Sequence, residues 1–123
     1  PAYLMTSAAV PKSQRISGIV IDAREHAVDP SMSPEVIDMQ GNLVYGTISY
    51  SRSKAVNRGP VGYAYSMDDR NVSQRVGSNP LFVEAVGSLD DDVYITSMDA
   101  AKVREAEKSF GVLSNCRVML LLQ

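Results

Sequence analysis

The stretch ISGIVIDA, residues 16–23, decides how this chain folds, because its apolar residues occupy both faces of an extended strand. Ile16 and Val20 point to one side, whereas Ile19 and Ile21 point to the other. A strand that is apolar on both faces is typical of the interior of a sheet. The stretch CRVMLLLQ, residues 116–123, has the same character. We therefore expect these two segments to lie side by side in the middle of a sheet.

The remaining elements predict an α+β fold with a mixed, mostly antiparallel sheet, one main amphipathic helix and an irregular middle segment. A hairpin is expected in EVIDMQGNLVYGTISY (35–50), with Gly41 in its turn, and strands in LFVEAVGS (81–88) and DVYITS (92–97). The main helix, MDAAKVREAEKSF (98–110), can be capped by Thr96 or Ser97 and ends before Gly111. In the middle, residues 51–80, we expect one short helix with Ser66 as its N-cap.

Length and charge limit the classes of function. The 123 residues suit one domain, which we place at residues 16–123, with residues 1–15 as an extended arm or linker. The net charge of −2 and scattered basic residues do not favour nucleic acid as a partner. The longest apolar runs are too short to cross a bilayer. The chain has one cysteine and one histidine, and its acidic runs lack the spacing of a calcium loop, so we predict neither a metal site nor a cofactor.

Asp22 and Arg24 alternate at the end of the first apolar strand and so project to the same side. A carboxylate and a guanidinium placed in this way can hold a polar ligand, or they can pair and clamp the following loop to the strand end. We favour the clamp, since such pairs often satisfy one another.

His26 follows among acidic neighbours, a setting that suits a general base or a pH switch. No nucleophile stands at a recognisable spacing from it, and a solvated loop histidine is the simpler interpretation. Pro1 is similar to the N-terminal proline that serves as the catalytic base of the small tautomerases. Those chains run directly from the proline into a strand, whereas Pro11 and a polar stretch follow here. We therefore predict that the chain has no catalytic residues and is not an enzyme.

The tyrosines are candidates for an interaction surface, in particular Tyr45, Tyr63 and Tyr65. A row of aromatic rings can stack against a sugar or a base, and it can equally serve cross-strand packing. With Asp22 and Arg24 they form the alternative to a scaffold role: a site that binds a small polar molecule or a glycan.

Several blocks, among them GIVIDAR, MSPEVIDMQGNLVYG, RVGSNPLFVEAVG and DVYITSMDAAKVREAE, resemble a C-terminal domain of bacterial envelope proteins. Those proteins often carry a module related to the LPP20 lipoproteins and to FlgP, a flagellar outer-membrane assembly protein. After DAR, the resembling proteins tend to have a glycine, whereas this chain has Glu25 and His26.

The resemblance implies a periplasmic or outer-membrane-associated part without enzymatic activity and, by analogy with FlgP, assembly into rings around a flagellar motor. Our first hypothesis is accordingly a non-catalytic envelope domain that contacts other envelope proteins and forms a homo-oligomer. The second hypothesis is a periplasmic ligand- or glycan-binding module that uses Asp22, Arg24 and nearby tyrosines. An enzyme that uses His26 or Pro1 is the third.

Overall fold

A computed structural model describes residues 15–123, so the predicted arm and Pro1 lie outside the described residues, apart from Arg15. The strands form two four-stranded sheets. The first has the order β4-β8-β1-β5 and the second the order β3-β2-β7-β6. These strands are β1 (Gly18–Asp22), β2 (Val36–Asp38), β3 (Leu43–Tyr45), β4 (Gly62–Ala64), β5 (Pro80–Glu84), β6 (Gly87–Leu89), β7 (Asp92–Ile95) and β8 (Val118–Leu121). The helices are η2 (Thr47–Ser49, a 3-10 turn), α2 (Arg52–Arg58), α3 (Arg70–Val76) and α4 (Ser97–Phe110).

The two apolar segments lie side by side, as predicted. β1 and β8 pair in parallel, with Ile19 opposite Val118 and Ile21 opposite Leu120. All four residues of β8 are buried, as are the first four of β1. The two strands form the centre of the first sheet, and their position explains why the sequence needs apolar residues on both of their faces.

The α+β class is confirmed, and the strands divide into two sheets where a single one was expected. In the second sheet two of the three pairings are antiparallel, including the predicted β2–β3 hairpin. Its turn contains Gly41 at φ +84°, a conformation that other residues rarely adopt. In the first sheet every pairing is parallel. The prediction did not specify this, although near-continuous apolar strands are typical of parallel sheets that are covered on both faces.

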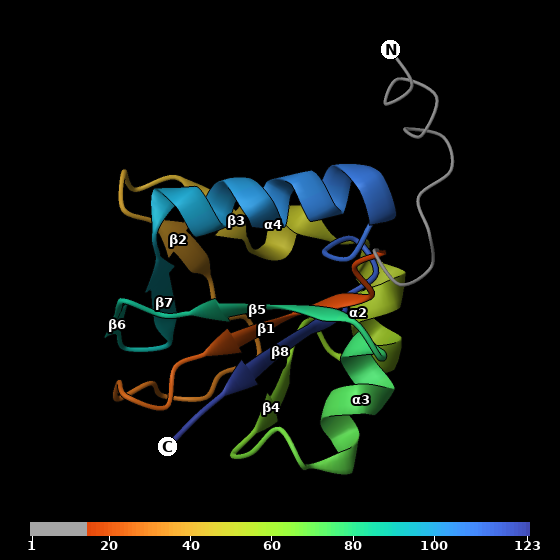
Figure 1. The fold of residues 1–123 in the computed structure, drawn as a ribbon, viewed down its shortest axis with the longest axis horizontal. Coiled ribbons are helices and arrows are strands. Elements are labelled where there is room, and N and C mark those ends of the chain that lie inside the picture. Colours follow the sequence, from red (N-terminus) through yellow and green to blue (C-terminus); the bar gives the residue numbers. More distant parts are fainter. Residues whose placement is uncertain (1–14) are drawn as a thin grey trace.

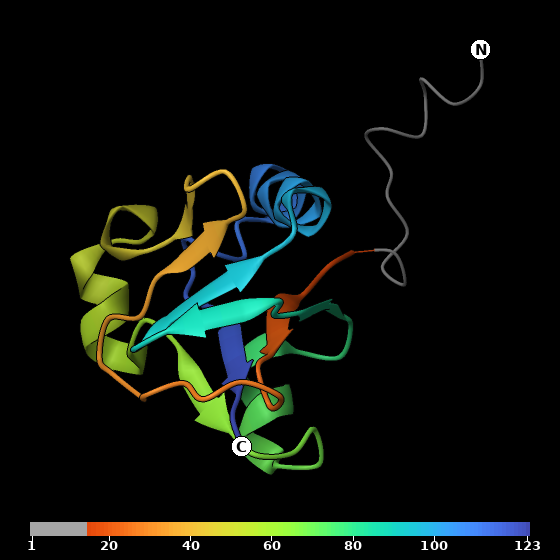
Figure 2. The ribbon, with the colours of Figure 1, turned by 90° about the vertical axis from the view of Figure 1, so that its left-hand side faces the viewer.

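Helices cover the parallel sheet on both sides (Figure 1). α4 packs with the second sheet onto the face that carries Ile19 and Leu120. α3 connects the two outer strands β4 and β5, and it covers the opposite face, where Val72 and Val76 pack against Val20. Figure 2 shows the same arrangement from the side, with α4 and α3 on opposite sides of the strands. None of the described helices has the length and apolar character that a bilayer crossing requires.

The middle of the chain is more regular than predicted, since residues 51–80 contain α2, β4 and α3. The short helix in this region exists, but its predicted cap is wrong. Asp69, not Ser66, is the N-cap of α3, and its side chain accepts a hydrogen bond from the Asn71 N–H at 2.9 Å. Ser66 Oγ instead accepts from the Asp68 N–H one turn earlier. For α4, Thr96 is the cap, and Gly111 follows in the left-handed conformation.

Candidate functional site

Asp22 and Arg24 form the predicted ion pair at the carboxyl end of β1, where Asp22 is the last residue of the strand. Arg24 Nε donates to Asp22 Oδ1 and Nη2 donates to Oδ2, each at 2.9 Å. The Arg24 backbone N–H also donates to Oδ1, at 3.1 Å, so the pair closes the turn that follows the strand. The hydrogen bond from the Arg24 side chain is the main reason why the pKa of Asp22 is lowered from its usual value. The geometry is that of a loop clamp.

A small pocket of about 270 Å³ lies at this clamp, lined by Asp22, Arg24, Glu25, Glu84 and Ala85. Three of the lining residues are acidic, and the single cation is already paired with Asp22. A negatively charged ligand would be repelled here, and a neutral polar ligand would have to compete with a two-point hydrogen-bonded pair. None of the three candidate tyrosines lines this pocket.

His26 lies beside the clamp, but it contacts backbone groups. Its Nε2 is 3.1 Å from the carbonyl oxygen of Ala85, which can only accept, so Nε2 carries the hydrogen in this arrangement. The His26 N–H donates to the Ala23 carbonyl at 3.0 Å. The first bond attaches the loop after β1 to the segment after β5, and the second closes a turn within the loop after β1. Within residues 15–123, no group of three His, Cys, Asp or Glu side chains is placed to hold a metal ion.

The three tyrosines do not form one surface, and the assignment of Tyr45 to an interaction surface is wrong. Tyr45 is only 1% exposed, and its hydroxyl donates to the Pro60 carbonyl. Burial raises the pKa of the Tyr45 hydroxyl. Tyr63 is half-buried, and its hydroxyl both donates to the Ser31 carbonyl and accepts from the Ser31 N–H. Only Tyr65, at 70% exposure, presents an open ring. A residue in a short strand can face the core or the solvent, and the sequence did not distinguish the two.

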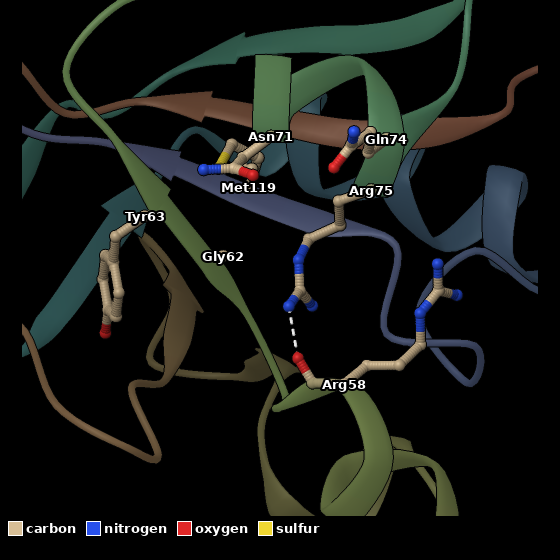
Figure 3. Close-up of a pocket in the computed structure, with 7 residues that line it drawn as sticks. All are labelled: Arg58, Gly62, Tyr63, Asn71, Gln74, Arg75 and Met119. Atoms are coloured by element: carbon tan, nitrogen blue, oxygen red, sulfur yellow. Dashed lines mark hydrogen bonds between the residues drawn. The ribbon is translucent and has the colours of Figure 1, made fainter. Parts of the chain in front are cut away.

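A second pocket, of about 390 Å³, lies near the amino ends of β4 and β8 (Figure 3). It contains two arginines and no acidic residue, which distinguishes it from the pocket at the clamp. The lining residues are Arg58, Gly62, Tyr63, Asn71, Gln74, Arg75 and Met119. We refer to it as the arginine pocket. Sequence analysis did not identify it, because it forms only when α3 packs against β4 and the end of α2.

Arg75 is the fixed cation of the arginine pocket. Its Nη1 donates to the carbonyl oxygens of Gly59, at 3.1 Å, and Cys116, at 2.9 Å, and its Nη2 donates to the carbonyl of Arg58. Figure 3 shows the last of these bonds, with the guanidinium reaching from α3 to the end of α2. Burial is the main cause that lowers the pKa of Arg75, and the nearby charge of Arg58 adds to it.

These observations define an α+β domain whose parallel sheet is covered on both faces. Its main polar features are the Asp22–Arg24 ion pair and the arginine pocket. Residues 18–123 match the family described as the second domain of Tp0624 of Treponema pallidum. The match covers most of the chain, and the chain therefore belongs to this family. No curated protein matched the sequence. The family description mentions neither LPP20 nor FlgP, so the resemblance to those proteins stays a prediction.

Proposed function

We propose that this domain is a non-catalytic interaction module of the bacterial cell envelope that associates with other protein chains, copies of itself included. The observation that carries the proposal is the outer edge of β5. Among residues 15–123, β5 pairs with β1 alone and is the last strand of the parallel sheet. No strand of the described chain pairs with the backbone groups on its other side, and such an edge is a template for pairing with another chain.

Apolar side chains accompany this edge. Phe82 of β5 is 45% exposed, and Val86, just after the strand, is 47% exposed. On the α4 side of β5, a groove of about 410 Å³ is bounded by Ile16, Leu81 and Phe110 and is almost entirely apolar. If β5 of a second copy pairs antiparallel about Phe82, the two Phe82 rings lie opposite one another, a favourable cross-strand arrangement. The edge thus offers backbone hydrogen bonds and apolar contact together.

Two further observations support an interaction role. The family is described as a second domain, so in Tp0624 this module is accompanied by another domain. The Nε2 atom of His26 donates to a backbone carbonyl and so is not free to act as a general base in this arrangement. The envelope location rests on the resemblance to envelope proteins, and the flagellar ring that it implies would be one assembly of this kind.

Light scattering after size exclusion tests the proposal over a range of protein concentrations. We expect the native chain to form an oligomer and Phe82→Lys to be monomeric, because a lysine on an edge strand opposes pairing. Ile48→Lys is the matched control, since Ile48 is 86% exposed and lies in η2, away from β5. It should leave the oligomer intact. A native chain that is monomeric at every concentration would contradict the proposal.

A further inference from the structure

We propose that the arginine pocket binds a small oxyanion, namely the carboxylate or phosphate group of a ligand. The first reason is the charge of the pocket. Its lining includes Arg58 and Arg75 and no Asp or Glu. Among the residues that the structure describes, no carboxylate oxygen lies within 4.0 Å of the Arg75 guanidinium. Neither arginine of the pocket forms an ion pair in the described part of the chain.

The second reason is that Arg75 is already held in one orientation. A guanidinium has five N–H donors, and the three carbonyl groups use three of them. The Nε–H and one Nη2 hydrogen have no acceptor among the described residues. Donors on neighbouring guanidinium nitrogens bind two oxygens of one carboxylate or phosphate. An anion would meet an arginine whose conformational freedom has already been lost, which favours binding.

The third reason is the glycine beside Arg75. A Cβ atom at position 62 would lie 2.6 Å from Arg75 Nε and 2.8 Å from Met119 Cε. Any other residue at position 62 would therefore displace the side chain of Arg75 or of Met119, both of which line the pocket. Glycine lets β4 pass close to the guanidinium without moving it.

The amides of α3 complete the site. Asn71 and Gln74 are exposed residues of α3 that line the pocket, and both carry NH₂ groups that can donate to an anion. Asn71 is four residues before Arg75, a spacing that places the two side chains next to each other on a helix. The site would thus combine the fixed guanidinium of Arg75, the second arginine and the neutral amide donors. All of these groups can donate hydrogen bonds to an anion at neutral pH.

Isothermal titration calorimetry with inorganic phosphate and, separately, with succinate tests the proposal at constant ionic strength. We expect saturable one-site binding of at least one of the two probes, and the preference between them distinguishes a phosphate ligand from a carboxylate ligand. Arg58→Gln should weaken binding about tenfold, the effect of losing one charged hydrogen-bond donor. Arg52→Gln is the matched control, because Arg52 is an exposed arginine of the same helix that does not line the pocket. It should bind as the native chain does.

A second pair of variants places a carboxylate inside or outside the pocket. Asn71→Asp supplies an internal carboxylate four residues before Arg75, and we expect it to compete with the probe and abolish binding. Ser73→Asp adds the same charge to α3 outside the pocket and should retain binding. The proposal is overturned if neither probe saturates, or if each pocket variant and its control change the affinity equally. Because Phe82 takes no part in the pocket, these results are independent of the oligomer test.

Discussion

Two arginines at opposite ends of the parallel sheet show how differently the same side chain can be used. Arg24 lies past the carboxyl end of β1, and its guanidinium makes two hydrogen bonds to the carboxylate of Asp22. Arg75 lies near the amino ends of β4 and β8, and its guanidinium donates to three carbonyl oxygens. The first cation is paired with a carboxylate, whereas the second has no carboxylate partner in the described part of the chain. The comparison teaches that an ion pair can serve only to close a turn. An arginine that donates to backbone carbonyls instead keeps a positive charge that can attract an anion.

The largest effect is expected from Arg75→Ala. Its guanidinium joins the end of α2 to the segment before β8, and its removal would leave three carbonyl groups without their donors. We expect the free energy of unfolding to fall by about 3 kcal/mol, in line with the loss of several charged hydrogen bonds. Urea denaturation measures it. Arg52→Ala, an exposed arginine on α2, is the control and should change stability by no more than about 0.5 kcal/mol. Equal effects of the two variants would contradict the claim that the hydrogen bonds of Arg75 stabilise the fold.

An effect of intermediate size, a pH dependence of the stability, is expected from Asp38. Its carboxylate forms an ion pair like that of Asp22 but is more deeply buried. Asp38 is 2% exposed, accepts from the N–H groups of Asn42 and Gln40, each at 2.9 Å, and pairs with Arg104 at 3.1 Å. The N–H of Asn42 is the main cause that lowers the pKa of Asp38. A lowered carboxyl pKa stabilises the fold above the unfolded value of about 3.9, and this contribution is lost as the pH falls through the folded value.

We therefore expect Asp38→Asn to be less stable than the native chain at pH 7, and the difference to shrink towards pH 3. Urea denaturation at both pH values measures the change. Asp68→Asn is the control, because Asp68 is exposed and forms no ion pair in the described part of the chain. A difference that stays constant between pH 7 and pH 3 would contradict the role of the ionised Asp38 carboxylate.

The smallest effect is expected from Arg24→Ala. The side chains of Arg24 and Asp22 are 41% and 18% exposed, and pairs open to solvent contribute little to stability. The backbone N–H of residue 24 can still donate to Asp22. We expect the melting temperature to change by no more than about 4 °C, and the pKa of Asp22 to rise towards its ordinary value in an NMR titration. A loss of stability as large as that of Arg75→Ala would contradict the claim that Arg24 contributes less to the stability of the fold than Arg75 does.

The sequence predicted the parts of the fold that local patterns determine. The apolar strands β1 and β8, the Gly41 hairpin and the helix capped by Thr96 all follow from periodicity or capping chemistry. It also placed Asp22 and Arg24 correctly, because their contact spans only two residues. α2 was missed, since its Val56 is 75% exposed and gives no apolar stripe to recognise.

What the sequence could not predict depends on contacts between distant segments. The Arg75 guanidinium meets the carbonyl of Gly59, 16 residues away, and that of Cys116, 41 residues away. Tyr45 was assigned to the surface because the burial of its strand is decided by packing with other segments. In both cases the three-dimensional contact, rather than the local pattern, determines what the residue does.

The central claim is that the Arg75 guanidinium, which has no carboxylate partner among the described residues, is open to an anion, whereas the Arg24 guanidinium is already paired with Asp22. The most direct test follows the Nε–H signals of both arginines in one ¹⁵N-labelled sample by NMR during a titration with inorganic phosphate at constant ionic strength. We predict that the Arg75 signal moves to a plateau while the Arg24 signal stays in place. Signals that move together without saturating, or a shift of the Arg24 signal alone, would contradict the claim.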